Sequence, residues 1–326
     1  MRPLQEGDAL AVIATGSVAF DYILSFDGRF ADHILLGKTH MINLSFLVAK
    51  LDKRRGGVAA NYAYNLARLG YPVAILATAG HDATGYRQWL EECGIECSGL
   101  RLLDDETTAT GFTTTDRDDN QITGYYGGAM LKAGILGLAD TDAEPEVVLI
   151  GPNAPDAMFR LVTECRERSI PWVFDPAHQL PHMSRADLEE GCRGAWILIG
   201  NDYEIELVQQ RMEVDMERLL RQVAIVVTTR GRAGSEVATR DGRVLIPPAP
   251  PERETDPTGA GDAYRAGLVA GLLRHLTFEE AGRIASLAAT YVVEQTGTIE
   301  HTYTMDAFAA RYATCFGQEL PNRFRP

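Results

Sequence analysis

A glycine-rich segment at residues 256–262, Asp-Pro-Thr-Gly-Ala-Gly-Asp, carries the residue types best suited to chemistry. It leads directly into a run of small residues with a helical pattern. Free N–H groups and the helix dipole make a helix start a site for an anion, and glycines let a bulky anion approach the main chain. We therefore expect Gly259, Ala260 and Gly261 to form an anion hole.

Asp262 lies in the first turn of the same predicted helix, where the helix field favours its ionised form. An ionised carboxylate beside an anion site suits a general base, which takes the proton of a hydroxyl as that hydroxyl attacks a phosphoryl group. An ordinary turn in which the aspartate only caps a helix has the same composition. The segment by itself leaves both interpretations open.

Three further motifs precede this segment. Residues 56–61 read Gly-Gly-Val-Ala-Ala-Asn, residues 201–204 read Asn-Asp-Tyr-Glu after a strand pattern, and residues 229–234 read Thr-Arg-Gly-Arg-Ala-Gly after the next one. In this order, and followed by residues 256–262, they resemble the signatures of the ribokinase-like (PfkB) sugar and nucleoside kinases. Any single motif is a weak signal, but four in order are specific.

Within that family, residues 15–21, 43–48, 55–59 and 256–267 most resemble bacterial adenosine kinases of the mycobacterial type, and the resemblance extends over roughly residues 9–300. It implies phosphoryl transfer from ATP to the 5′-hydroxyl of a nucleoside, adenosine to AMP. It also implies a need for Mg²⁺, a response to K⁺, and a homodimer formed through the small lid. A sugar kinase with a ribose- or fructose-type acceptor and a non-catalytic nucleoside or nucleotide sensor remain as alternatives.

The resemblance also implies roles for single residues, with Asp262 as the base and Asp21 binding the ribose hydroxyls. The expected substrate side comprises Ser17, Asp21, Ser45, Gly56, Gly57, Asn61, Phe112, Tyr125 and Gln179. The expected ATP side comprises Asn201, Thr229, Gly231 and Gly234.

Asn201, Glu204 and Phe112 need a further comment. Asn201 and Glu204 are expected to hold Mg²⁺ through water, although the same pair also reads as a helix capping box. A one-residue slip in strand register would turn Phe112 to the other face of its strand.

The elements that position these residues alternate between short β-branched runs and helical segments, which is typical of a mostly parallel sheet flanked by helices. Buried strands are expected at residues 10–14, 73–77, 147–150, 172–174, 196–199 and 224–228. Helices are expected at 58–69, 83–92, 156–168, 203–211, 260–275, 278–294 and 305–314.

Residues 21–50 and 107–126 break the alternation, and the second segment reads as a hairpin with a polar tip at 116–121. We expect a ribokinase-like α/β fold with a large domain at 1–18, 50–106 and 128–326. A small β-lid would comprise residues 19–49 and 107–127. Antiparallel strands added to the edge of the main sheet are the alternative.

Composition limits the partners. The 31 Lys and Arg residues against 45 Asp and Glu give a net charge of −14, which argues against nucleic-acid or anionic-membrane surfaces. The five cysteines are odd in number and scattered, and no secretion signal is evident. These features predict a cytoplasmic protein that binds small molecules.

Overall fold

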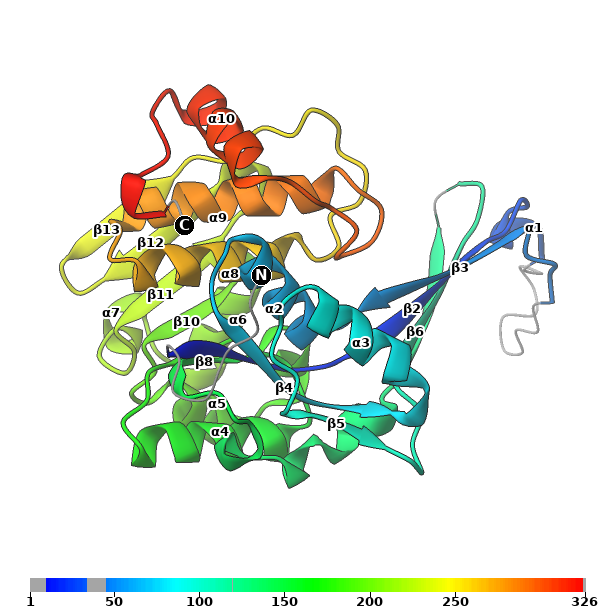
Figure 1. Ribbon diagram of the computed structural model, residues 1–326, viewed down its shortest axis with the longest axis horizontal. Coiled ribbons are helices and arrows are strands. Elements are labelled where there is room, and N and C mark those ends of the chain that lie inside the picture. Colours follow the sequence, from blue (N-terminus) through cyan, green and yellow to red (C-terminus); the bar gives the residue numbers. More distant parts are fainter. Residues whose placement is uncertain (1–9, 34–44, 119, 325–326) are drawn as a thin grey trace.

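The computed structural model describes residues 10–33, 45–118 and 120–324, and two separate β-sheets organise them (Figure 1). The larger sheet has nine strands in the order β13-β12-β11-β10-β9-β8-β1-β4-β5. The strands from β5 to β11 in this order run parallel, and β12 and β13 form an antiparallel hairpin at one edge. Their bounds are β1 (Ala11–Thr15), β4 (Val73–Gly80), β5 (Leu100–Leu103), β8 (Pro145–Ile150), β9 (Trp172–Phe174), β10 (Ile197–Asn201), β11 (Ile225–Thr229), β12 (Ser235–Thr239) and β13 (Gly242–Ile246).

Helices cover both faces of this sheet because its central strands are apolar on both sides. Val12 of β1 belongs to one buried cluster, and its neighbour Ile13 belongs to the other. The first cluster packs against α2 (Val58–Arg68), α3 (Thr84–Glu92), α8 (Ala260–Leu273), α9 (Phe278–Val293) and α10 (Met305–Phe316). The second packs against α4 (Pro155–Glu167), α5 (Arg185–Cys192), α6 (Asp202–Met212) and α7 (Met216–Leu219).

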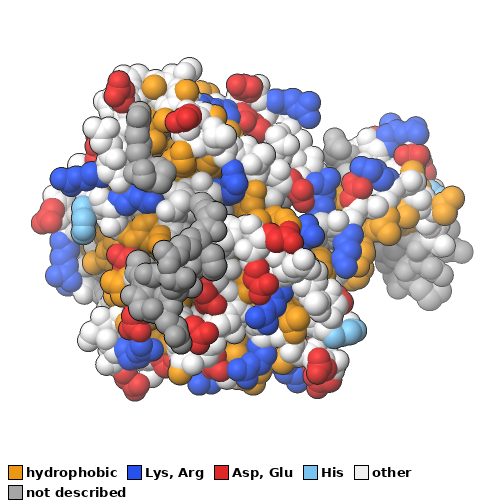
Figure 2. All heavy atoms as spheres, in the orientation of Figure 1, with side chains coloured by type: hydrophobic (Ala, Val, Ile, Leu, Met, Phe, Trp, Pro, Cys, Tyr) orange, Lys and Arg blue, Asp and Glu red, His pale blue; other side chains and the backbone are white. Residues whose placement is uncertain are grey.

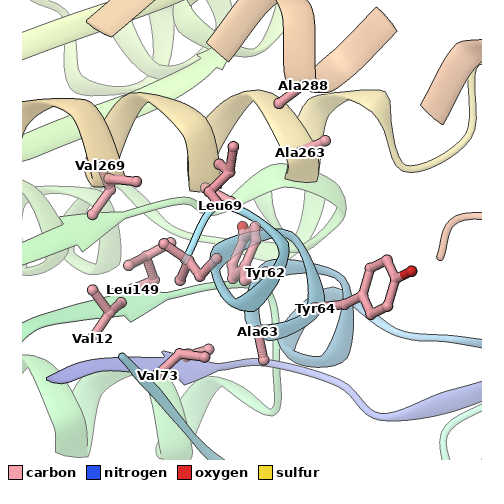
Figure 3. Packing of buried hydrophobic residues seen from close by; sticks show 14 of the residues in the cluster. Val12, Tyr62, Ala63, Tyr64, Leu69, Val73, Leu149, Ala263, Val269 and Ala288 are labelled. Atoms are coloured by element: carbon pink, nitrogen blue, oxygen red, sulfur yellow. The ribbon is translucent and has the colours of Figure 1, made fainter. Parts of the chain in front are cut away.

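The first cluster fixes α2 and α8 to the sheet. Figure 3 shows Tyr62 of α2 close to Leu149 of β8, with Ala263 of α8 on the neighbouring helix. All three side chains are almost fully buried. Small residues allow close packing of the helices: a Cβ on Gly267 of α8 would lie 2.7 Å from the Cα of Ala285 in α9. The start of each helix is therefore held firmly at the edge of the sheet.

The smaller sheet projects from this body (Figure 1). Its four strands follow the order β3-β2-β6-β7. β2 pairs antiparallel with β3 and parallel with β6, and β6 and β7 form the expected hairpin. Their bounds are β2 (Ala19–Ser25), β3 (Lys50–Gly56), β6 (Ala109–Thr115) and β7 (Gln121–Tyr126), with α1 (Phe30–His33) after β2.

Short 3₁₀ turns complete the chain. Their bounds are η1 (His81–Ala83), η2 (Gly128–Ile135), η3 (Leu138–Asp140), η4 (Ala177–His182), η5 (Gly231–Ala233) and η6 (Asn322–Phe324). In the part of the chain that the structure describes, no helix has both the length and the apolar character needed to span a bilayer.

The expected architecture, a mostly parallel sheet flanked by helices with a separate small sheet, is confirmed. All six expected strands are present, but β5 and the β12–β13 hairpin were not predicted. Arg240 and Asp241 form the turn between β12 and β13, and the Asp241-Gly242 dipeptide at the start of β13 is the sequence signal that could have revealed the hairpin. The domain boundaries stay a prediction. Residue 50 was assigned to the large domain, but it begins strand β3, which belongs to the small sheet.

Candidate active site

The starts of α2 and α8 meet at the carboxyl edge of the large sheet. Nδ2 of Asn61 in α2 donates a 2.7 Å hydrogen bond to Oδ2 of Asp262 in α8. Asn61 is 3% exposed, and its Oδ1 is buried without a hydrogen-bond partner among the described residues. A buried acceptor without a partner calls for an explanation. Because Asn61 lies beside Asp262, its Oδ1 can accept a hydrogen bond from a ligand bound there.

Gly57 lets the chain turn from the small sheet into α2. It caps the helix with φ 97°, in the left-handed region that favours glycine. A Cβ here would lie 2.6 Å from the carbonyl oxygen of Ser17 and 2.6 Å from the nitrogen of Ala19. Ser17 in turn accepts hydrogen bonds from Val58 N at Oγ (3.1 Å) and from Ala59 N at its carbonyl (3.0 Å).

The start of α8 has the geometry expected of an anion hole. Gly259 is its N-cap with φ 83°, and no side chain caps the first turn. Asp256 orders the preceding turn by accepting hydrogen bonds from Thr258 N (3.0 Å) and Gly297 N (3.1 Å). The N–H of Ala260 donates to the carbonyl of Pro257 (3.2 Å), so an anion would be bound by the remaining uncapped N–H groups of this first turn.

The pKa of Asp262 differs from the sequence-based expectation. Burial raises the pKa of this carboxyl to about 6, while Arg265 and the Asn61 hydrogen bond lower it, and Asp175 and Glu204 raise it. The group is still mainly ionised at neutral pH, but it is a stronger base than an ordinary aspartate. A base whose pKa lies near the working pH is well matched to proton transfer.

A buried ion pair beside Asp262 was not predicted from the sequence. Nε and Nη2 of Arg265 contact Oδ2 (2.5 Å) and Oδ1 (2.9 Å) of Asp175, which follows β9. The hydroxyl of Tyr62 also donates to Asp175. Arg265 itself was the available signal, because it is a charged residue within a helix of small residues that is expected to be buried. A buried charge of this kind needs an oppositely charged partner.

On the substrate side, the structure brings Asp21, Gly56, Ser17 and Tyr125 together. A Cβ on Gly56 would fall against Oδ2 of Asp21, and one on Gly111 would lie 2.8 Å from Oδ1. Burial and the nearby Asp256 raise the pKa of Asp21. Gly111 of β6 pairs with Asp21 of β2 on one side and with Tyr125 of β7 on the other. Tyr125 and Asp21 therefore lie on the same face of the small sheet.

Three predicted substrate residues are not brought into this group. Phe112 points to the opposite face, where its ring stacks on Tyr22 at 5.2 Å. Ser45 is exposed next to Phe46, whose ring packs on Phe26 at 4.5 Å beyond the far end of β2, and residues 43 and 44 of the same motif lie outside the described residues. Gln179 is partly buried in η4, four residues after Asp175.

Three of the four predicted ATP-side residues line a cleft of about 610 Å³, and Asn201 is not among its lining residues. Its walls include Thr229 at the end of β11, Gly231 and Gly234 of the loop that follows, and Ala260 and Gly261 at the start of α8. Proline-rich chain and the apolar side of α9 supply the remaining wall, including Pro248, Pro250, Pro251, Ala289 and Val293. An apolar cleft that ends at an anion hole fits a nucleotide.

Asn201 and Glu204 form the capping box that their spacing indicated. Asn201 Oδ1 accepts from Glu204 N (2.8 Å), and Glu204 Oε2 accepts from Asn201 N (2.7 Å). No group of three His, Cys, Asp or Glu residues within the described ranges could hold a metal ion directly. This donor set fits a hydrated magnesium ion beside phosphates better than a metal enclosed by protein ligands.

Comparison with known proteins gives consistent matches. The pattern of the pfkB family carbohydrate kinases matches residues 22–305. A curated nucleoside kinase from Methanothermobacter thermautotrophicus is 33% identical over 317 residues, which is 95% of this chain and 98% of the relative.

Two solved structures are similar over nearly the whole chain. A Burkholderia thailandensis nucleoside kinase in complex with inosine has a TM-score of 0.85 at 34% identity, over 95% of this chain and 99% of that one. A Methanocaldococcus jannaschii nucleoside kinase, described as an archaeal member of the ribokinase family, has a TM-score of 0.84 at 28% identity, over 94% of this chain and 99% of that one.

Proposed function

This chain belongs to the pfkB family of carbohydrate kinases, and we propose that it transfers the terminal phosphoryl group of ATP to the 5′-hydroxyl of a nucleoside. One observation carries the proposal. The turn from Gly259 to Asp262 lies between the apolar cleft beside Thr229 and the group formed by Asp21, Ser17 and Tyr125. A donor and an acceptor can thus approach the same turn from two sides.

A nucleoside acceptor accounts for the residues on the small sheet. The two oxygens of Asp21 can accept hydrogen bonds from vicinal ribose hydroxyls. The ring of Tyr125 lies on the same face of the sheet and is 51% exposed, which leaves a surface for an aromatic base. The relatives named nucleoside kinases and the inosine-bound structure support this choice over a free sugar.

Among nucleosides we propose a purine nucleoside, with adenosine as the first candidate. The sequence resemblance to bacterial adenosine kinases of the mycobacterial type points to adenosine. The Burkholderia relative was solved with inosine, another purine nucleoside, which supports inosine as a second candidate.

The residues divide the chemistry between them. Asp262 takes the proton of the attacking hydroxyl, which typically contributes about 100- to 10,000-fold to the rate. The N–H groups at the start of α8 stabilise the charge on the transferring phosphoryl group, and each such donor is worth on the order of 3 kcal/mol. Asn61 holds Asp262 in place through its 2.7 Å hydrogen bond.

Magnesium bound to the nucleotide would neutralise part of the phosphate charge. Glu204 could hold its water shell, since only one of its oxygens is used by the hydrogen bond from Asn201 N. Burial raises the pKa of Glu204, and the hydrogen bond from Asn201 N lowers it. A potassium requirement follows from the family resemblance alone and is proposed on that ground.

An acceptor panel tests the proposed function. The chain would be incubated with Mg²⁺ and ATP and with adenosine, inosine, cytidine, ribose or fructose, and ADP release and the phosphorylated product would be measured. We expect nucleoside 5′-monophosphates, with adenosine or inosine preferred. Turnover with free sugars alone would make the chain a sugar kinase, and binding without any turnover would make it a sensor.

We also propose that two copies associate through the outer face of the small sheet. That face carries Phe112, Leu51, Ile122 and Tyr126, which are 48–58% exposed. Figure 2 shows hydrophobic side chains on the projecting small sheet. Exposed apolar surface of this kind is typical of a protein interface. Light scattering should give the mass of a dimer for the wild type and of a monomer for Ile122→Glu, and a wild-type monomer would refute the proposal.

A further inference from the structure

Arg265 connects three parts of the candidate site. It lies one helical turn after Asp262 in α8 and is 6% exposed. Its Nε and Nη2 contact both oxygens of Asp175, and Nη2 also lies 3.9 Å from Oε2 of Glu204. The guanidinium thus joins the catalytic helix to the chain after β9 and to the start of α6.

Neighbouring residues hold the guanidinium in this place. The hydroxyl of Tyr62, fully buried in α2, donates to the same carboxylate of Asp175. A Cβ on Gly261 would lie 2.7 Å from Nη1 of Arg265. One hydrogen bond, from Nη2 to Asp175 Oδ1, and the close ion-pair contact of Nε with Oδ2 hold the guanidinium, so it could not move aside cheaply. The glycine in the anion hole therefore also makes room for Arg265.

The chain after Asp175 is under local strain. Ala177 has φ 34°, a left-handed value that is strained for a residue with a Cβ. It begins the η4 turn (Ala177–His182), which contains Gln179, the residue expected to contact the acceptor. Strained backbone persists only where its surroundings hold it, and the pairing of Asp175 with Arg265 supplies such an anchor.

We propose that Arg265 is a positioning residue that fixes the acceptor-side turn at residues 175–179 against the helix that carries Asp262. The inference rests on the proposed function, because it assumes that an acceptor binds beside this turn. A hydrophobic pair of similar volume would hold the fold equally well. The buried charge of Arg265 is better explained if it also sets the position and the ionisation of Asp262.

The charged and polar groups that face Asp262 come from four elements. They are Asn61 and Tyr62 of α2, Arg265 of α8, Asp175 after β9 and Glu204 of α6. Arg265 is the only cation among them. Removing its charge leaves two carboxylates near the base, so the pKa of Asp262 should rise.

Two substitutions separate charge from geometry. Arg265→Gln removes the charge, so the acid limb of the pH–rate profile should move to higher pH by about 1–3 units. Arg265→Lys keeps the charge but loses the two-pronged contact with Asp175. Its acid limb should stay near that of the wild type, while KM for the acceptor rises about tenfold and KM for ATP changes little.

Arg283→Gln is the matched control. Arg283 is also largely buried and ion-paired, with Glu279 at 2.5 Å, but it lies in α9 away from the site. It should alter neither the pH profile nor the acceptor KM. Asp175→Asn gives a second route if Arg265→Gln does not fold, and it should likewise raise the acceptor KM.

Two outcomes would overturn the proposal: folded Arg265 variants with the pH profile and acceptor KM of the wild type, or equal effects of Arg265→Gln and Arg283→Gln. The measurements use whichever acceptor the wild type phosphorylates. If the wild type shows no turnover, the proposed function fails. In that case the pKa of Asp262 can still be measured by carboxyl ¹³C NMR in the wild type and in Arg265→Gln. The comparison shows whether Arg265 lowers the pKa of Asp262.

Discussion

Asn61 and Asp262 lie 201 residues apart in the sequence, and a 2.7 Å hydrogen bond joins their side chains. The bond links the starts of two helices that leave the same edge of the sheet. It holds one oxygen of Asp262 and leaves the other available. The carboxylate is thereby oriented before any substrate binds, as a general base needs to be.

The pH profile of the wild type should reflect this environment. Burial raises the pKa of Asp262 to about 6, and only the deprotonated carboxylate can accept the proton of the hydroxyl. The rate should therefore be constant above the pKa and fall about tenfold per pH unit well below it. Measurement of kcat/KM for the acceptor from pH 5 to 9 checks this. A rate that stays constant down to pH 5 would contradict the assignment of the base.

The acceptor site should depend on Tyr125 and not on Phe112. Tyr125 shares a sheet face with Asp21, whereas Phe112 stacks on Tyr22 on the other face. Tyr125→Leu should raise KM for the nucleoside by roughly 3- to 10-fold through lost stacking. Phe112→Leu is the control and should leave that KM unchanged. The reverse order of effects would show that Phe112, and not Tyr125, lies in the acceptor site.

Gly57 should be sensitive to the smallest substitution. Gly57→Ala forces a Cβ into a left-handed residue (φ 97°) with backbone atoms of Ser17 and Ala19 at 2.6 Å. We expect the free energy of unfolding to fall by at least about 1–3 kcal/mol, as measured by urea denaturation.

Gly85→Ala is the matched control, because Gly85 lies within α3 with nothing within 4 Å of an added Cβ. It should raise the free energy of unfolding by about 0.5–1 kcal/mol. Equal effects of the two substitutions would show that the crowding at Gly57 is relieved in solution.

The sequence predicted most of the main sheet because its strands are continuous apolar runs such as residues 73–77, which have few alternatives to burial. The β12–β13 hairpin was missed because β13 is mostly exposed. The turn from Gly259 to Asp262 could be proposed as an anion hole with its base from the sequence because these residues are contiguous in the chain.

The remaining parts of the site depend on contacts between distant segments. Asp175 and Arg265 are 90 residues apart, and no local pattern marks their pairing. The hairpin pattern did not fix the strand register, so the sequence left the face of Phe112 open. The structure places its side chain on the face opposite Asp21. Such pairings become visible only once the fold has brought the strands together.

The central claim is that Asp262 is the base in phosphoryl transfer, and Asp262→Asn tests it most directly. Asparagine keeps the size of the side chain but cannot accept the proton. Single-turnover transfer from ATP to adenosine should slow about 100- to 10,000-fold, while ATP binding measured by calorimetry stays unchanged. Asp306→Asn, at an exposed position in α10, should behave as the wild type. Transfer by Asp262→Asn at the wild-type rate would contradict the mechanism.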